Sequence, residues 1–184
     1  MNLPITLMPP SRSLACALLV ACGVALWAPL AVADEYTEVQ RLQRTGQTAE
    51  ALARADKYIA GNPRDPQMRF IKANLLTAAG RSGEAEPVLV QLTRDAPELA
   101  EPWNNLAVLY AGRGQLDQAQ EALAAALRIN PNYSTALENM GDVRIRQAAE
   151  AYRRARQLDA ANPRLAPKLE ALGSVTSARP KPGG

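Results

Sequence analysis

Three kinds of residue recur along this chain at one interval of 34 positions. The recurring residues are Gly46, Gly80 and Gly114, then Ala51, Ala85 and Ala119, and then Pro63, Pro97 and Pro131. One period shared by three residue types is the signature of a repeat architecture, in which each unit buries its apolar face against its neighbours. The repeat therefore limits the possible folds more than any other feature of the 184 residues.

Each recurring residue has a mechanical reason to stand where it does. The glycine follows a first helix, where the chain turns sharply and a positive φ is easily adopted only by glycine. The alanine lies early in a second helix, where a larger side chain would push the two helices apart. The proline stops that second helix at Asn62, Ala96 and Asn130, because proline disfavours helix in the residue before it. Each unit is therefore predicted to be a helix hairpin.

The clearest copy lies between residues 100 and 133. Its pattern is Trp103-x2-Leu106-Ala107-x2-Tyr110, then Gly114, Ala119-x3-Leu123-x2-Ala126 and Pro131. This pattern resembles the tetratricopeptide repeat (TPR) family. The resemblance implies an all-α fold, a right-handed α-solenoid of helix hairpins. We expect a divergent first copy at residues 34–65, a second at 66–99 and the best match at 100–133, with Trp103 and Tyr110 as structural residues.

The fourth copy departs from the pattern. Its first helix keeps phase at Leu137 and Met140, but Ala148-x3-Tyr152 repeats the third copy at an offset of only 29 residues. The missing residues are those that would form the glycine turn. We therefore predict one long fused helix over residues 134–160, closing the array. A C-terminal helix within 161–172 and a disordered tail over 173–184 complete the predicted chain.

The first 33 residues have the features of an export signal. Arg12 is the only charge before Asp34, an apolar run spans residues 14–30, and Ala31 and Ala33 form an Ala-x-Ala cleavage site. We expect cleavage after Ala33 and a periplasmic location, with about 150 residues remaining for one domain. Two alternatives stay open: acylation of Cys22 as a membrane-anchored lipoprotein, and an uncleaved membrane anchor.

The composition excludes most catalytic chemistry. The chain has no histidine, and both of its cysteines, Cys16 and Cys22, lie in the predicted signal. No phosphate-binding glycine loop is present, and the carboxylates have no common site on which to converge. We predict no enzymatic activity, no cofactor and no metal. The formal net charge of +3 is too small to indicate a nucleic-acid partner.

The resemblance also implies a working surface. TPR arrays as a family hold a peptide or protein segment in a concave groove formed by the first helices. The peptide-binding positions carried over are Tyr36, Gln40, Phe70, Asn74, Asn104, Val108, Glu138 and Asp142. Among these, Asn74 and Asn104 have side-chain amides that can pair with the backbone of an extended peptide.

A cluster of arginines lies in the predicted long helix. Its members are Arg144, Arg146, Arg153, Arg154 and Arg156. Glu150 stands four residues from both Arg146 and Arg154, which predicts partial charge compensation along a solvated helix face. Two classes of function follow from these patterns. One is a non-enzymatic scaffold or adaptor in the bacterial envelope that binds another protein. The other is a membrane-tethered structural component of an assembly.

Overall fold

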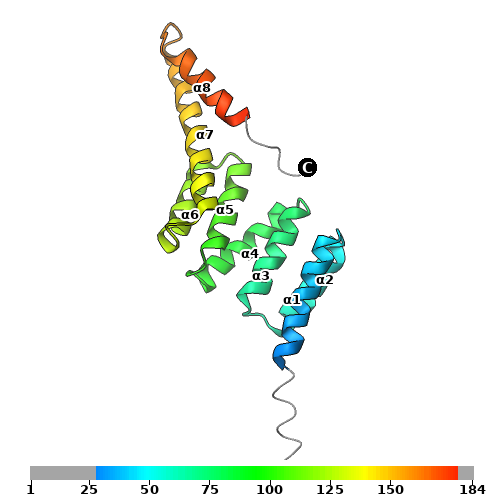
Figure 1. The fold of residues 1–184 in the computed structure, drawn as a ribbon. Coiled ribbons are helices and arrows are strands. Elements are labelled where there is room, and N and C mark those ends of the chain that lie inside the picture. Colours follow the sequence, from blue (N-terminus) through cyan, green and yellow to red (C-terminus); the bar gives the residue numbers. More distant parts are fainter. Residues whose placement is uncertain (1–27, 178–184) are drawn as a thin grey trace, which may run out of the picture. The chain divides into compact units, whose positions relative to one another are not determined.

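The computed structural model describes the backbone of residues 28–177 and the side chains of residues 35–175. This part of the chain is helical and contains no strand, as the repeat pattern predicts (Figure 1). The helices are α1 (Ala28–Arg44), α2 (Thr48–Gly61), α3 (Pro66–Ala78), α4 (Ser82–Asp95), α5 (Ala100–Gly112), α6 (Leu116–Ile129), α7 (Ser134–Leu158) and α8 (Leu165–Ser177).

The chain divides into two compact units, with the boundary after Tyr58 inside α2. In the first unit, side chains of α1 contact side chains of α2. Arg54 Nε donates to Glu35 Oε2 at 2.7 Å, and the rings of Tyr36 and Tyr58 lie 5.6 Å apart between centroids. Val39 and Leu42 of α1 and Ala51 and Ala55 of α2 have no exposed surface, so buried apolar side chains accompany these contacts in the hairpin. The predicted cleavage point after Ala33 falls within α1, whereas Arg12, Cys16 and Cys22 lie outside the described residues.

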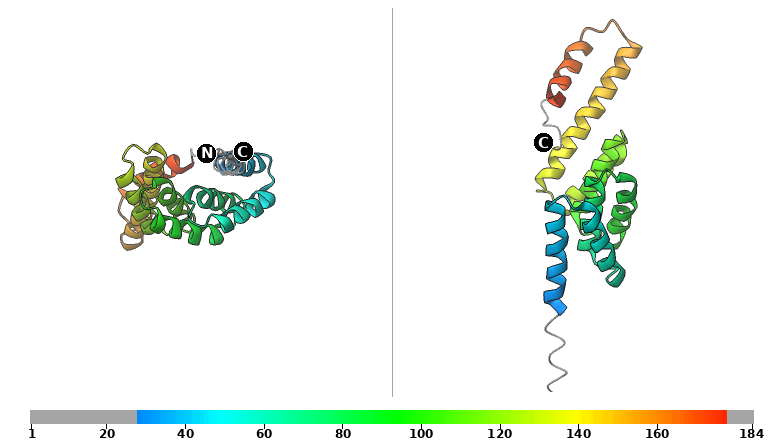
Figure 2. Two further views of the ribbon diagram at one scale, coloured as in Figure 1. Left: turned by 90° about the horizontal axis from the view of Figure 1, so that it is seen from below. Right: turned by 90° about the vertical axis from the view of Figure 1, so that its right-hand side faces the viewer.

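The second unit, residues 59–184, contains two hairpins followed by a helix pair. Helices α3 and α4 pack together, as do α5 and α6, and α4 packs against α5. Helix α7 begins against α5 and α6, and its second half extends beyond them with α8 alongside (Figures 1 and 2). The second half of α7 therefore has α8 as its main neighbour.

The three repeat glycines all adopt the left-handed backbone conformation. Their φ angles are 76° at Gly46, 74° at Gly80 and 77° at Gly114. Across the last of these turns, the Gln115 amide donates to the Tyr110 carbonyl at 2.9 Å and the Gly114 amide donates to the Ala111 carbonyl at 3.1 Å. This pattern is a Schellman motif, which satisfies the free carbonyls at the end of α5. The predicted role of these glycines is confirmed.

The repeat alanines and prolines lie as predicted, whereas the two aromatic residues of the third copy are less buried than the alanines. Ala51, Ala85 and Ala119 have no exposed surface, and α4 and α6 end just before Pro97 and Pro131, with Ala96 and Asn130 as C-caps. Trp103 and Tyr110 are only half-buried. Both residues line an open cavity of about 420 Å³ between α4 and α6.

The long closing helix is confirmed, since α7 runs for 25 residues from Ser134 to Leu158 without a turn. The prediction for the C-terminus was wrong in part. Helix α8 continues to Ser177, five residues past the predicted end of the helix at residue 172. A single glycine such as Gly173 costs a helix only about 1 kcal/mol, and the Ser174 hydroxyl donates to the Ala171 carbonyl at 2.8 Å. Gly173 is therefore accommodated rather than acting as a stop.

Within residues 28–177, no helix combines the length and apolar character needed to cross a membrane.

Candidate binding surface on the first helices

Four asparagine side chains form a connected row across α3, α5 and α7. Asn139 Nδ2 donates to Asn104 Oδ1 at 2.8 Å, and Asn104 Nδ2 donates to Asn105 Oδ1 at 3.2 Å. Asn105 Nδ2 then donates to Asn74 Oδ1 at 2.7 Å. We call these four residues the asparagine row. It links the first helices of three successive repeats. All four residues belong to the second compact unit.

The row has a direction, because every amide donates toward α3. Among the described residues, the Asn74 amide nitrogen donates to no group and the Asn139 amide oxygen accepts from none. Every buried polar side-chain atom in the described part of the chain has a partner. The two unused atoms therefore reach solvent, so that the row has an accessible donor at Asn74 and an accessible acceptor at Asn139.

The Asn104 amide is not accessible to a peptide, although the sequence predicts that it is. Its side chain is only 4% exposed, and both its amide nitrogen and its amide oxygen are engaged by neighbouring asparagines. Asn104 therefore orients Asn105 and Asn139 rather than presenting its own amide to solvent. The accessible amides are those at the ends of the row.

The other predicted positions in the second unit lie near the row along the same helices. Phe70 is one helical turn before Asn74 on α3 and is half-buried. Val108 is one turn after Asn104 on α5, and 47% of its surface is exposed. On α7, Glu138 is exposed and Asp142 is partly buried, and these two residues flank Asn139. Apolar and acidic side chains thus accompany the amides.

Tyr36 and Gln40 lie on α1 in the first compact unit, whereas the asparagine row lies in the second. Gln40 is exposed on α1, as predicted for a surface position. Tyr36 is half-buried and its ring contacts Tyr58 at an interplanar angle of 56°. This contact gives Tyr36 a packing role inside its own hairpin.

Sequence reasoning missed Asn105 and Asn139 as members of this surface. Asn105 lies 31 residues after its partner Asn74, and Asn139 lies 35 residues after its partner Asn104. Neither pair therefore has the 34-residue spacing from which the binding positions were predicted. The residue type, rather than the repeat spacing, could have indicated these two positions. Four asparagines fall in the first helices of consecutive units, where amides can pair with one another.

The described residues contain no group of three histidine, cysteine, aspartate or glutamate side chains arranged to hold a metal ion. The side chains along this surface are amides, the apolar groups of Phe70 and Val108, and the carboxylates of Glu138 and Asp142. Such groups can make hydrogen bonds and packing contacts with a partner.

Comparison with known proteins places this geometry in a family. A segment of 85 residues is 34% identical to the TPR repeat-containing thioredoxin TTL4 of Arabidopsis thaliana, covering 46% of this chain and 12% of that protein. The chain therefore spans about an eighth of the length of this curated relative.

Solved structures show the same fold. YrrB, described as a TPR protein with an unusual peptide-binding site, superposes with a TM-score of 0.53 at 27% identity, over 56% of this chain and 54% of that one. The first TPR domain of Spaghetti (RPAP3), bound to the HSP90 peptide SRMEEVD, gives a TM-score of 0.58 at 14% identity, over 61% and 89% of the two chains.

Two models of the tetratricopeptide repeat match the sequence directly, one over residues 36–100 and the other over residues 76–141. Together they extend from residue 36 to residue 141, which is more than half of the 184 residues. The chain belongs to the tetratricopeptide repeat family.

Proposed function

We propose that this protein is a non-enzymatic scaffold of the bacterial envelope that binds an extended segment of a partner protein along α3, α5 and the start of α7. The asparagine row is the observation that carries the proposal. An extended peptide has one amide donor and one carbonyl acceptor per residue, and the row offers an accessible donor at Asn74 and an accessible acceptor at Asn139.

The surroundings of the row suit a protein partner. Amide–backbone hydrogen bonds tolerate many peptide sequences, whereas apolar contacts supply most of the binding energy at protein interfaces. The half-buried Phe70 and the exposed Val108 provide apolar contacts one turn from the amides. The peptide-binding site named for YrrB, which is 27% identical to this chain, supports the same type of partner.

The envelope location rests on the N-terminal sequence. The apolar run over residues 14–30 and the small residues Ala31 and Ala33 support export and cleavage before Asp34. Sequencing the N-terminus of the protein purified from its source tests this proposal. A mature chain that starts at Asp34 agrees with a periplasmic scaffold. A chain that starts at an acylated Cys22 would favour the alternative role in a membrane-tethered assembly.

Site-specific crosslinking tests the binding surface. A photoreactive benzoylphenylalanine replaces Val108, and in a control protein it replaces Ile129, which is 38% exposed on α6. Both proteins are irradiated in the envelope of the source cells, and the products are identified by mass spectrometry. We expect a partner protein to be crosslinked from position 108 and not from position 129.

The row is tested in the same experiment by an Asn74→Ala variant. Loss of the accessible donor should lower the yield of the crosslink at position 108 by about fivefold, since one net hydrogen bond contributes about 1 kcal/mol. Asn132→Ala, at an exposed turn residue, is the matched control and should leave the yield unchanged. Equal yields from positions 108 and 129, or an unchanged yield in Asn74→Ala, would contradict the proposal.

A further inference from the structure

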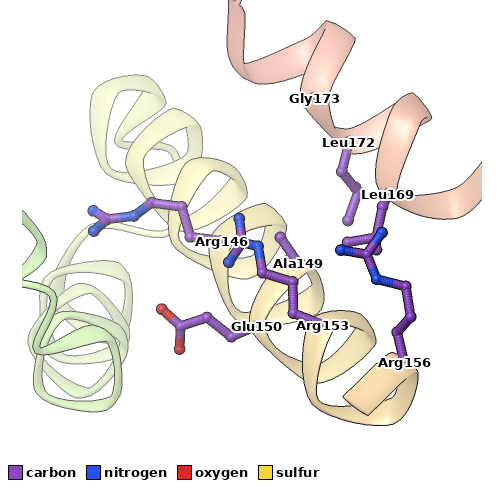
Figure 3. Close-up of a pocket in the computed structure, with 8 residues that line it drawn as sticks. All are labelled: Arg146, Ala149, Glu150, Arg153, Arg156, Leu169, Leu172 and Gly173. Carbon is purple, nitrogen blue, oxygen red and sulfur yellow. The ribbon is translucent and has the colours of Figure 1, made fainter. Parts of the chain in front are cut away.

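The second half of α7 and the facing side of α8 enclose a cleft of about 410 Å³, which we call the α7–α8 cleft (Figure 3). Its lining residues are Arg146, Ala149, Glu150, Arg153, Arg156, Leu169, Leu172 and Gly173. The cleft lies beyond the asparagine row along α7, because Asn139 stands in the first two turns of that helix. An occupant of this cleft would therefore use a surface separate from the one proposed above.

The charge in the cleft is predominantly positive and largely unpaired. Arg146 is half-buried, and its Nη1 donates to the Ala111 carbonyl at 2.6 Å, so its charge is held in place without a carboxylate partner. Arg153 and Arg156 are exposed and make no ion pair or hydrogen bond with any described residue. They stand three positions apart on one face of α7, where like charges repel each other.

Glu150 stands four residues from both Arg146 and Arg154, the spacing from which partial charge compensation was predicted. Within residues 35–175, no ion pair joins Glu150 to Arg146 or to Arg154, and Arg154 Nη1 instead donates to Gln157 Oε1 at 3.4 Å. Figure 3 shows the Glu150 carboxylate on the side of α7 away from α8, whereas the Arg156 guanidinium reaches toward Leu169. The Arg146 guanidinium points away from α8 as well, toward Ala111 of α5, so Arg156 supplies the positive charge nearest to α8.

The remaining lining of the cleft is apolar. Ala149 is buried at the base, and Leu169 and Leu172 of α8 are half-buried opposite it. A phosphate polymer or a lipid headgroup would use the guanidinium groups and leave this apolar wall exposed. A peptide with acidic and aliphatic side chains would use both, since guanidinium groups bind carboxylates strongly and aliphatic side chains gain energy by burial.

We propose that the α7–α8 cleft binds an acidic, leucine-bearing segment of a partner protein. A carboxylate of that segment lies between the guanidinium groups of Arg153 and Arg156 and relieves their mutual repulsion. An aliphatic side chain of the segment packs on Leu169 and Leu172. The volume of the cleft falls within the range of small ligand pockets, so it accommodates a few side chains rather than a whole domain.

Calorimetric titration of the full chain with short peptides tests the proposal. The probe is an acetylated and amidated peptide of alternating leucine and glutamate, measured in buffer of about 0.15 M ionic strength. Its two controls replace every glutamate by glutamine or every leucine by serine. We expect the probe to bind and each control peptide to bind at least about tenfold more weakly, because one loses the charge-assisted hydrogen bonds and the other the apolar contact.

Matched protein variants locate the binding. R153Q/R156Q should weaken the acidic peptide by at least about tenfold. R144Q/R154Q removes the same charge from exposed residues of the same helix that do not line the cleft, and it should stay within about twofold of the wild type. Glutamine and arginine have similar helix propensities, so both variants should fold, and circular dichroism checks this.

Several outcomes would overturn the proposal. One is absence of binding at peptide concentrations up to about 1 mM, and another is an equal loss of affinity in both double variants, which would indicate a general charge effect. A third is binding of anionic vesicles or polyphosphate that depends on Arg153 and Arg156 while the acidic peptide fails to bind. Asn74→Ala should bind the acidic peptide as tightly as the wild type does. A result that contradicts the proposed function of the asparagine row can therefore be told apart from one that contradicts binding in the α7–α8 cleft.

Discussion

At the scale of single residues, two glycines have opposite conformational requirements. Gly114 has a φ of 77°, whereas Gly141 lies inside α7 with ordinary helical backbone, and a Cβ at either position would meet no atom within 4 Å. Gly114→Ala should therefore lower the free energy of unfolding by about 1–2 kcal/mol through backbone strain alone. Gly141→Ala should raise it by about 0.5–1 kcal/mol, because alanine favours helix. Urea denaturation measures both changes.

Each variant serves as the control for the other, since both add a single methyl group. No loss of stability in Gly114→Ala would mean that the turn between α5 and α6 is not left-handed in solution. A destabilised Gly141→Ala would mean that α7 is not a continuous helix at Gly141. Gly114→Asn should be milder than Gly114→Val, because asparagine enters the left-handed region more readily than a β-branched residue does.

The carboxylate of Asp95 makes the stability of the second unit depend on pH. The pKa of Asp95 is lowered from its ordinary value, first by the hydrogen bond from Arg69 and then by the one from Gln91. The Arg69 Nη1 to Asp95 Oδ2 distance is 2.7 Å, and this pair joins α3 to the end of α4. A lowered folded-state pKa stabilises the fold above the unfolded pKa of about 4, and this stabilisation is lost as the pH falls further.

The melting temperature should therefore fall as the pH is lowered from about 5 to about 3. Asp95→Asn should melt at a lower temperature than the wild type at neutral pH and should show a smaller drop on acidification. Glu121→Gln, which removes an exposed carboxylate from the middle of α6, is the comparison for a general effect of lost negative charge. Parallel pH profiles for wild type and Asp95→Asn would show that the Arg69–Asp95 pair does not contribute.

The conformation of some single residues can be predicted from the sequence, whereas the burial and hydrogen-bond partners of others cannot. The conformation of Gly114 follows from the repeat, because a sharp turn after a helix requires a positive φ. The partial burial of Trp103 does not follow from it, because exposure depends on how closely α4 and α6 approach each other around the cavity. Asn105 was likewise missed, since its partner Asn74 lies 31 rather than 34 residues away.

At the scale of elements, the asparagine row links α5 to α7 as well as presenting a binding surface. Asn104 is 4% exposed and fully engaged, so Asn104→Ala leaves Asn105 and Asn139 with unpaired groups. We expect this change to lower the free energy of unfolding by about 1–3 kcal/mol. Asn74→Ala removes the single hydrogen bond from the half-buried Asn105 amide and should cost about 1 kcal/mol. Urea denaturation distinguishes the two variants.

A double-mutant cycle isolates the contact between α5 and α7. Asn104→Ala and Asn139→Ala should be coupled by at least about 0.5 kcal/mol, since the two amides are hydrogen-bonded at 2.8 Å. Asn104→Ala combined with the distant Asn132→Ala should be additive. Additive effects in both pairs would mean that the row contributes little to holding α7 against α5, and that its amides are free to serve binding alone.

The elements were predictable wherever a local signal decided them. The fourth repeat lacks the five residues that would form the turn between its two helices. The sequence therefore predicts one long helix, which is α7 in the structure. The end of α8 did not follow, because Gly173 resembles a stop signal yet is tolerated inside the helix. The α7–α8 cleft requires the register between two helices, which periodicity alone does not determine.

At the scale of the whole molecule, the second unit has a gradient of packing along the chain. Helices α5 and α6 pack against each other, α5 also packs against α4 and α7, and α6 also packs against α7. Each of the two helices buries six residues. Helix α8 packs chiefly against α7, and Leu165 is its buried residue among the side chains described. In a repeat protein, local stability follows the interfaces that each element makes. The central hairpin should therefore be the most stable part of this unit.

Native-state hydrogen exchange measures this gradient directly. Amides of α5 and α6 should exchange only through global opening of the unit, whereas amides of α8 should open with a free energy lower by at least about 2 kcal/mol. Adding urea below the unfolding transition should accelerate α5 more steeply than α8, because global opening exposes more surface than local opening does. Equal opening free energies in α5 and α8 would mean that the unit unfolds as one cooperative block. With the gradient present, the α7–α8 cleft lies at the end of the unit that rearranges most easily when a partner binds.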